Sequence, residues 1–328
     1  MGVSSSAPVG VANRSANPLA TFQALSPAQR REAIQGFIFI SPWVIGFIAF
    51  TAYPMLASLY YSFTDYKILS SPVWLGLHNY VYAFTGAPLG AGDALFWVAL
   101  SRTFIWVVFS VPLGVAGSLL AATLLNRGIR GTSIFRTCFF LPSLTPIVAA
   151  GLLWAWILQP DIGVLNTVLA SVAGIKGPNW LYSLTWSMPS LMTVALWTGI
   201  GGDRMLIFLA GLQGIPADVY DAAKTDGANS FQRWVYITVP LMSPAILFTM
   251  ILGVIASFRV FALAFVTTNG GPAYATYFYS LHLYVQAFSS FDMGYACALA
   301  WILFAIVLTI TMIQMKLSNR WVYYESLR

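Results

Sequence analysis

Charged side chains inside long apolar stretches are the first candidates for chemistry in this sequence. Asp203 is followed directly by Arg204, and Arg259 lies within the largely apolar run 253–261. A charge in hydrocarbon is costly, so such residues usually face the interior of a helical bundle and contact a solute or another charge. On a regular helix, Asp203 and Arg204 would point about 100° apart. These positions predict either contact with a solute or an ion pair with a partner chain.

The sequence offers little for catalysis or nucleotide binding. The chain has four lysines and none follows a glycine, so it lacks the Gly-Lys-Ser/Thr loop that cradles phosphates. His78 and His282 belong to separate predicted loops, and Cys138 and Cys297 lie in apolar runs that favour core packing. We therefore expect that the chain is not an enzyme and that it holds no metal or cofactor.

The composition is that of a membrane protein. Of the 328 residues, 59% are apolar and only 8% are charged, whereas a soluble domain is about 25% charged. The net charge of +6 is scattered along the chain, which argues against a nucleic-acid-binding patch. Membrane lipid is therefore an expected partner, and nucleic acid is not.

The elements that must position these residues are six membrane-spanning helices. Each apolar segment is long enough to cross a bilayer, which takes about 20 residues, and backbone groups in lipid must bond internally, as in a helix. The predicted spans are 36–62, 97–124, 138–158, 187–212, 241–267 and 294–315. The predicted organisation is an N-terminal tail at 1–35 with a short interfacial helix from Ser26, a membrane domain at 36–316, and a C-terminal tail at 317–328. Proline and glycine interruptions within the spans favour a moving transporter over an anchor.

Basic residues predict the orientation. The tails and the loops at 125–137 and 213–240 carry eleven lysines and arginines, whereas the loops at 63–96, 159–186 and 268–293 carry two. The first set is Arg14, Arg30, Arg31, Arg127, Arg130, Arg136, Lys224, Arg233, Lys316, Arg320 and Arg328. Because basic residues concentrate on the cytoplasmic side, both termini are predicted to face the cytoplasm.

The loop 216–240 is the most structured of the predicted loops. Pro216 is expected in the first turn of a short helix, with Asp218 near its N-terminus, and Gly227 is expected to end it. A second short helix then leads to Pro240, which is expected to start the next span. Such a helix–turn–helix suits docking to another protein, although a plain connector fits these residues equally well.

The loop resembles a known family motif. Asp221-Ala222-Ala223, Gly227 and then Ile237-x-Val239-Pro240 are similar to the EAA loop of permease subunits in ATP-binding-cassette (ABC) importers. Asp221 stands for the usual glutamate and Val239 for the usual leucine. The resemblance implies that two ATPase subunits, which bind ATP and Mg, dock here. The implied coupling residues are Asp221, Ala222, Ala223, Asp226, Gly227, Ala228 and Pro240.

Three further motifs resemble the maltose-type carbohydrate permeases. They are Leu75-Gly76-Leu77-x-Asn79-Tyr80, Thr268-Asn269-Gly270-Gly271-Pro272 and Phe291-x-x-Gly294-Tyr295-Ala296. The resemblance implies an all-α, six-helix type I ABC importer permease in a bacterial inner membrane. It also implies a second homologous permease subunit, an extracytoplasmic binding protein and a carbohydrate substrate.

Substrate contacts follow from the same resemblance. The implied contact positions that carry a hydroxyl are Ser143 and Ser257, and the region Trp197-Thr198-Gly199 also matches. Asp203 and Arg259 are added for their charge. Hydroxyls bond the rim of a sugar and an aromatic face packs on its ring, although core packing is the better explanation of Trp197.

Arg259 has no acid in its own span, which suggests an anionic cargo such as a uronic-acid oligosaccharide, since the guanidinium fork suits carboxylates. The alternative is an ion pair with an acid on a partner subunit. For the whole chain, the alternative function is an ion-coupled carrier of a small polar solute. Such a carrier needs acids inside its spans, and only Asp203 fits.

Overall fold

The structure is a computed structural model that describes residues 26–86, 92–126 and 131–323. The predicted tail at 1–25 lies outside the described residues, as do Arg14, Arg127, Arg130 and Arg328. By its contacts the chain divides into two units, Met1–Ser58 and Leu59–Arg328, which are described separately.

The first unit is a long apolar helix. Its first part, α2 (Pro27–Phe47), begins with a capping box in which Ser26 and Gln29 bond each other's backbone N–H groups. A helix does begin at Ser26, but it is not a separate short helix, because it continues without a break through a π-helical turn at Ile48–Ala52 into α3 (Tyr53–Tyr61). None of its most apolar stretch is buried. Such a surface suits lipid or a partner subunit.

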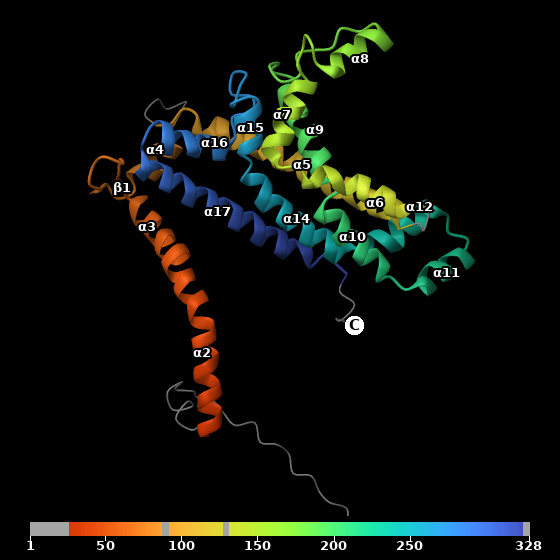
Figure 1. Cartoon of the computed structure of the whole chain (residues 1–328), viewed down its shortest axis with the longest axis horizontal. Coiled ribbons are helices and arrows are strands. Elements are labelled where there is room, and N and C mark those ends of the chain that lie inside the picture. The colour runs from red at the N-terminus through yellow and green to blue at the C-terminus, as the bar shows by residue number, and fades with distance from the viewer. Residues whose placement is uncertain (1–25, 87–91, 127–130, 324–328) are drawn as a thin grey trace, which may run out of the picture. The chain divides into compact units, whose positions relative to one another are not determined.

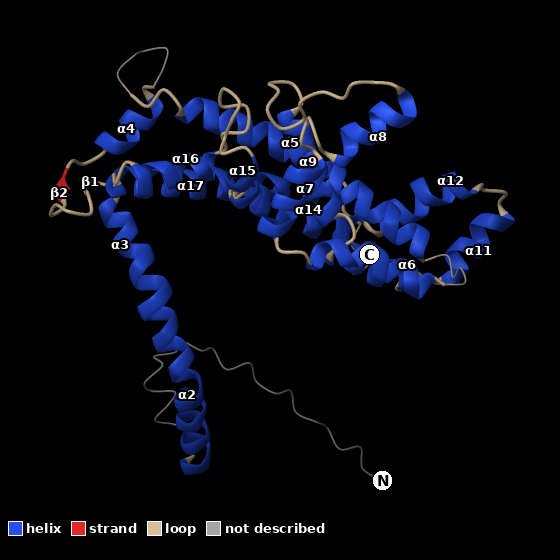
Figure 2. Cartoon of the chain, turned by 45° about the horizontal axis from the view of Figure 1, so that its top comes forward, coloured by secondary structure: helices blue, strands red, loops and turns tan. Residues whose placement is uncertain are grey.

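The second unit is helical apart from one short strand pair (Figures 1 and 2). The strands β1 (Thr64–Asp65) and β2 (Val73–Trp74) pair antiparallel. The helices are α4 (His78–Phe84), α5 (Phe96–Leu125), α6 (Thr132–Phe140), α7 (Ile147–Ile157), α8 (Val164–Ala173), α9 (Ser187–Gly199), α10 (Asp203–Gln213), α11 (Ala217–Thr225), α12 (Ser230–Arg233), α13 (Val239–Leu241), α14 (Ser243–Phe258), α15 (Ala262–Thr267), α16 (Tyr279–Tyr284) and α17 (Met293–Ser318). A 3₁₀ turn at Leu141–Leu144 and π-helical turns at Trp234–Thr238 and Val285–Ser289 complete the described elements.

The described helices supply up to six membrane crossings. The helix Pro27–Tyr61, α5 and α17 are each long and apolar enough to cross alone. Three further crossings are bent pairs: Thr132–Leu144 with Ile147–Ile157 bends by 96°, Ser187–Gly199 with Asp203–Gln213 by 49°, and Ser230–Leu241 with Ser243–Phe258 by 67°. The bends fall at Pro146, at Gly201-Gly202 and before Pro244, where proline or glycine interrupts the helical hydrogen bonds.

One predicted span differs from the structure. A single helix was expected over 241–267, but α14 ends at Phe258 and a separate helix, α15, begins at Ala262. The backbone leaves the helical region at Phe261, with φ of −140°. Hydropathy does not detect this break, because the residues on both sides of it are apolar.

The core of this unit is built around α5. Helices α10 and α14 pack along α5, and α15 packs on α7. Leu191, Met205, Phe208 and Phe258 are fully buried in the resulting apolar cluster. Because lipid is as apolar as these side chains, close van der Waals packing holds the helices together, and α5 is the element against which the site-bearing helices are positioned.

The motifs at 75–80 and 291–296 have structural roles. Asn79 donates through its side-chain amide to the carbonyls of Ser62 (3.0 Å) and Thr64 (2.9 Å). A side chain at Gly294 would overlap the carbonyl of Thr64, and the Gly294 N–H donates to Tyr66 O at 2.9 Å. These motifs therefore hold the strand pair against the start of α17.

Candidate functional site

The loop 216–240 begins with a short helix, α11, whose C-terminal end is capped by backbone hydrogen bonds. Pro216 occupies the N-cap of α11, one position before the first turn where it was predicted. At the other end Gly227 adopts a left-handed φ of +80°, and the Ala228 N–H donates to Ala223 O at 2.9 Å. Gly227 thus ends α11 as predicted, because glycine adopts positive φ without steric cost.

The second half of the loop differs from the prediction at Pro240. Asn229 and Gln232 form a capping box that starts α12. Pro240 lies inside α13, and α14 begins at Ser243, after the 67° bend, with Pro244 in its first turn. The bent crossing therefore includes residues before Pro240, because Ser230–Leu241 is one of its two arms.

Two side-chain hydrogen bonds tie the loop together and to the bundle. The Tyr220 hydroxyl lies 3.0 Å from Thr238 Oγ1, which joins α11 to the π-helical turn. Trp234 Nε1 donates to Thr123 Oγ1 on α5 at 3.4 Å. The loop is thus hydrogen-bonded to α5, the central helix of the bundle. These contacts offer a path by which a displacement of α11 could reach α5.

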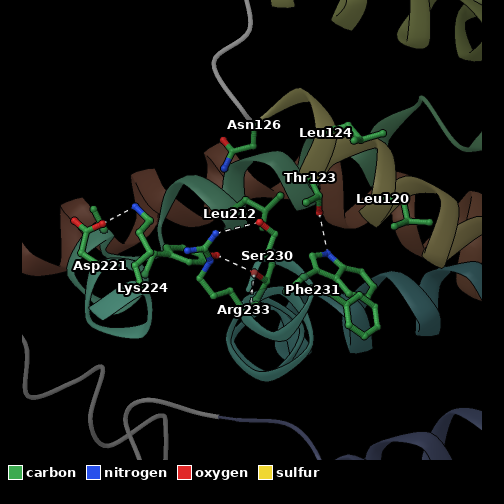
Figure 3. A pocket seen from close by; sticks show the side chains of 14 residues that line it. Leu120, Thr123, Leu124, Asn126, Leu212, Asp221, Lys224, Ser230, Phe231 and Arg233 are labelled. Carbon is green, nitrogen blue, oxygen red and sulfur yellow. Dashed lines mark hydrogen bonds and ion pairs between the residues drawn. The ribbon is translucent and has the colours of Figure 1, made fainter. Parts of the chain in front are cut away.

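A groove of about 930 Å³ lies between α11, α12 and the end of α5 (Figure 3). Asp221 on its wall pairs with Lys224 at 2.7 Å, and their side chains are 65% and 57% exposed. Phe231 and Tyr236 expose more than 70% of their surface. Exposed aromatic and charged side chains on a fastened helix pair form a surface suited to a protein partner.

The predicted coupling residues all lie on this described loop. Asp221, Ala222 and Ala223 are on α11, and Asp226, Gly227 and Ala228 form its C-terminal turn. Except for the partly buried Ala223 and Ala228, these side chains and Pro240 are exposed. They are therefore available to a partner.

The predicted substrate residues gather only in part. Ser143, Thr198, Gly199 and Asp203 line a cavity of about 280 Å³ between the 3₁₀ turn at Leu141–Leu144 and the α9–α10 bend. Ser257 lines a second cavity of about 60 Å³, which also includes Gly199. The helix breaks between Gly199 and Asp203, beside the cavity that Ser143 and Thr198 line.

Trp197 and Arg259 line neither cavity. Trp197 packs edge-on against Trp154, with ring centroids 5.7 Å apart. Arg259 caps the C-terminus of α14 and is exposed. Their substrate contacts stay predictions.

Arg204 is the residue that the sequence-based site omits. It lines both cavities, and its guanidinium occupies the space that a side chain at Gly114 would take. The sequence signal was present, since Arg204 is a charge inside an apolar span. Its direction was not readable, because the helix breaks just before it.

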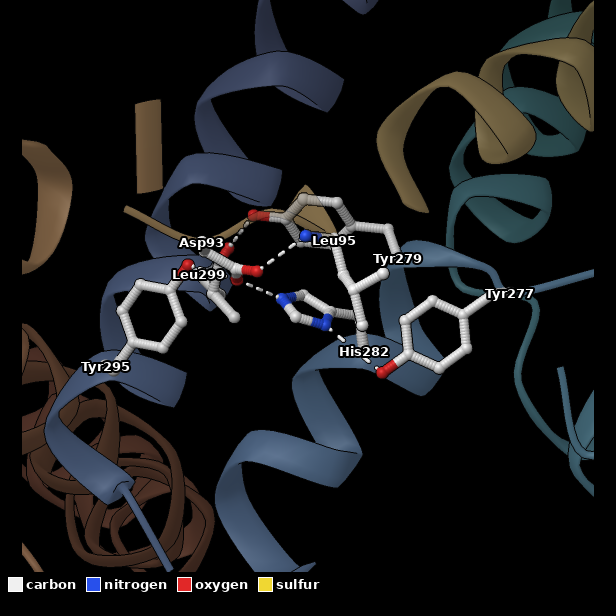
Figure 4. A network of polar contacts seen from close by, with 7 residues as sticks. All are labelled: Asp93, Leu95, Tyr277, Tyr279, His282, Tyr295 and Leu299. Carbon is white, nitrogen blue, oxygen red and sulfur yellow. Dashed lines mark hydrogen bonds and ion pairs between the residues drawn. The ribbon is translucent and has the colours of Figure 1, made fainter. Parts of the chain in front are cut away.

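A buried polar network that joins the segment before α5 to α16 and α17 was also missed (Figure 4). Asp93 Oδ2 accepts from His282 Nε2 and from the Tyr295 hydroxyl, both at 2.6 Å, and Oδ1 accepts from the Leu95 N–H at 2.9 Å. The Tyr277 hydroxyl lies 3.2 Å from His282 Nδ1. The network links the segment before α5 to α16 and α17. The described residues contain no cluster of three His, Cys, Asp or Glu that suits a metal.

The network perturbs the titration of its members. Burial alone raises the pKa of Asp93, but the hydrogen bonds from His282 and Tyr295 outweigh it and hold the pKa below its ordinary value. Burial, together with the Asp93 charge, raises the pKa of Tyr277 to about 12. Asp93 is therefore an ionised acceptor near neutral pH, and the Tyr277 hydroxyl keeps its proton.

A family model described as the binding-protein-dependent transport system inner membrane component matches residues 114–322, more than half of the chain. The chain belongs to this family. The predicted family, the permease subunits of carbohydrate ABC importers, is confirmed. The predicted fold class, an α-helical multi-pass inner-membrane permease, is confirmed as well. The family works with a binding protein, and its members translocate a solute rather than catalyse a reaction.

The relatives of this permease are named as transport proteins, and they match it along most of their length. It is 41% identical to the probable ABC transporter permease protein YesP of Bacillus subtilis, over 90% of this chain and 94% of YesP. It is 32% identical to the arabinooligosaccharides transport system permease protein AraP of Halalkalibacterium halodurans, over 86% and 87% of the two chains. A solved bacterial alginate ABC transporter in complex with its alginate-bound periplasmic protein contains a chain of the same fold, with a TM-score of 0.78 at 21% identity, covering 89% of this chain and 96% of that one.

Proposed function

We propose that this permease is one half of the membrane pathway of an ATP-driven carbohydrate importer. A second homologous permease subunit completes the pathway, two ATPase subunits that bind ATP and Mg dock at loop 216–240, and an extracytoplasmic binding protein delivers the cargo. The observation that carries the proposal is the exposed α11, ended by Gly227 and fastened to α5 through Trp234. Relatives named for arabinooligosaccharide and lactose transport support the carbohydrate class.

Coupling runs through α11 as a rigid element. When the ATPase subunits close on ATP, they displace α11, and the bonds Tyr220–Thr238 and Trp234–Thr123 carry the displacement to α5. Helices α10 and α14, which bear Asp203, Arg204 and Ser257, pack on α5 and move with it. A shift between two packed arrangements is the physical requirement for coupling distant sites.

The cavities at the α9–α10 bend form the cargo contacts of this half of the pathway. Ser143, Thr198 and Ser257 present hydroxyls that bond the rim of a sugar. Gly199 leaves space beside them. Trp197 and Arg259 join this surface when the second permease subunit and the cargo are present.

The proposed orientation places both termini and loop 216–240 in the cytoplasm, on the basis of the basic-residue asymmetry. It is tested by cysteine labelling in a background with Cys138 and Cys297 replaced by alanine. A cysteine at the exposed Ser230 should resist an impermeant thiol reagent in whole cells, and one at the exposed Ser171 on α8 should react. The reverse pattern contradicts the orientation.

The assembly is tested by pulling the tagged permease from native membranes in mild detergent and identifying what accompanies it. Recovery of an ATPase and a second six-span subunit, with the ATPase lost in an Asp221→Asn, Gly227→Ala double variant, supports the proposal. Recovery of the chain alone, with transport that persists without ATP, favours the ion-coupled carrier instead.

A further inference from the structure

We propose that Arg204 selects an acidic carbohydrate as cargo by binding an oxyanion, such as the carboxylate of a uronic acid, in the small cavity between α5, α9 and α14. The inference rests on the proposed function and names the chemical class of its substrate. It places the charge-reading group at Arg204 instead of Arg259.

The bundle is shaped around the Arg204 guanidinium. A Cβ at Gly114 on α5 would overlap Nη1, whereas one at Gly253 on α14 would lie at an ordinary contact distance of 3.6 Å from Nη2. Gly114 therefore leaves room for the guanidinium, which lies close to both helices. An arginine that merely snorkelled to the interface would need no such space.

The guanidinium has no partner among residues 26–86, 92–126 and 131–323. The ion pairs within these ranges are Asp221–Lys224 and Asp93–His282, and no hydrogen bond there involves the Arg204 side chain. Asp203 is adjacent in sequence but is exposed and lines only the larger cavity. A partly buried cation in a membrane bundle is costly without a counter-charge, so the counter-charge comes from outside the described chain.

A second, independent feature points to a ligand in the small cavity. Ser110 is 7% exposed and lines this cavity, and its hydroxyl has no hydrogen-bond partner in the described part of the chain. Ser257 lines the same cavity, and the eight described lining residues include no acid. Buried hydroxyls are normally satisfied, so an oxyanion that bonds Arg204 and Ser110 would satisfy both groups at once.

The sizes of the two cavities divide the cargo into a charged group and a ring. The small cavity of about 60 Å³ exceeds the roughly 10–15 Å³ that one water needs, which suits a carboxylate better than a sugar ring. The larger cavity of about 280 Å³, which Arg204 lines together with Ser143 and Thr198, suits the ring and its hydroxyls.

The test is ATP-driven uptake by the complete importer in proteoliposomes with its binding protein. The probes are trigalacturonate, the carboxyl-reduced neutral trisaccharide of the same length, and a sugar phosphate, which separates a carboxylate from a phosphate ligand. We expect the wild type to favour an acidic probe. Arg204→Gln should lower the acidic-to-neutral uptake ratio by on the order of tenfold to hundredfold, the worth of hydrogen bonds to a charged group.

Three variants keep the test independent of folding. Arg204→Lys keeps the charge without the planar fork and should give an intermediate ratio. Gly114→Ala should lower the ratio by displacing the guanidinium, whereas the matched variant Gly117→Ala, which meets only the flexible Ile200 side chain, should not. A fall of the ratio in Arg259→Gln and not in Arg204→Gln would overturn the assignment.

The outcomes separate this inference from the proposed function. Equal loss of acidic and neutral uptake in Arg204→Gln means that Arg204 pairs with the other permease subunit, and it overturns the inference. Uptake of the neutral probe alone by the wild type overturns the inference while the importer stands. If the wild type takes up no carbohydrate with ATP, the proposed function falls and the inference falls with it.

Discussion

Trp234 donates its indole N–H to Thr123 Oγ1 at 3.4 Å, across 111 residues of sequence, and so fastens loop 216–240 to the central helix of the bundle. The bond is long for a neutral hydrogen bond. Among the described residues, however, it is the side-chain hydrogen bond that joins this loop to α5. The contact joins the π-helical turn after α12 to α5, and the Tyr220–Thr238 bond joins α11 to the same turn.

Removing this fastening should weaken coupling more than assembly. In Thr123→Val the methyl groups keep the packing and the hydrogen bond, worth about 1 kcal/mol, is lost. We expect a roughly fivefold lower ratio of solute transported to ATP hydrolysed, with the ATPase still recovered in pull-downs. Unchanged coupling in both Thr123→Val and Trp234→Phe would show that the contact transmits nothing.

Gly227 should matter through its position and not only through stability. Its φ of +80° and the φ of +64° at Gly174 both lie in the left-handed region, and neither glycine has a neighbour within 4 Å of an added Cβ. Alanine at either site should therefore cost about 1–2 kcal/mol from backbone strain alone. Only Gly227→Ala should reduce ATPase capture, because Gly174 ends α8, away from loop 216–240. Equal capture by the two variants argues against docking at α11.

Asp221 should contribute to docking without stabilising the free permease. Its pair with Lys224 is exposed and separated by three residues, and such pairs are worth about 0.3–0.5 kcal/mol. The carboxylate is thus free to exchange Lys224 for an arginine of the ATPase. Asp221→Asn should leave the melting temperature within about 1 °C and weaken ATPase capture, and Asp221→Glu should restore it. A melting temperature that falls together with capture assigns Asp221 a structural role.

The Asp93 network should stabilise the outer loops in a pH-dependent way. The folded-state pKa of Asp93 is lowered, so its stabilisation is complete above the unfolded value of about 3.9 and is lost as pH falls through the folded value. Asp93→Asn should lower the melting temperature at pH 7 by several degrees, since hydrogen bonds to a buried charge are worth about 1.5–3 kcal/mol.

The control for this prediction is how the difference in melting temperature between wild type and Asp93→Asn changes with pH. The melting temperatures of wild type and Asp93→Asn should converge only as pH falls through the lowered folded-state pKa of Asp93, below its ordinary value, where the wild-type carboxyl also becomes neutral. Tyr295→Phe removes one of the two side-chain donors to Asp93 Oδ2 and should show a smaller loss. A difference that persists unchanged to low pH would mean that Asp93 acts through shape instead of charge.

Local signals in the sequence were sufficient for most of the helices and for the first half of loop 216–240, but not for the break at Phe261 or the path at Pro240. Apolar length set the spans, and Gly227 and the Ser26 cap set helix ends, because each depends on neighbours within a few residues. The contacts of Asp93 with His282 and Tyr295 join positions about 190 to 200 residues apart, and no periodicity encodes them.

The two arginines show the same limit at the cavities. Arg259 follows the last turn of α14 and turns outward, whereas Arg204 follows a helix break and turns inward. Which arginine enters the bundle depends on the backbone path at Gly201-Gly202 and at Phe261. Hydropathy and motif spacing do not determine that path.

The most direct measurement of the central claim is solute uptake into proteoliposomes that contain this permease, its homologous partner and the ATPase, with the loaded binding protein outside and ATP inside. We predict uptake that requires all of these components and falls when Asp221 and Gly227 are replaced together. Uptake by the permease alone, driven by an ion gradient and indifferent to ATP and to the loop variants, would contradict the account.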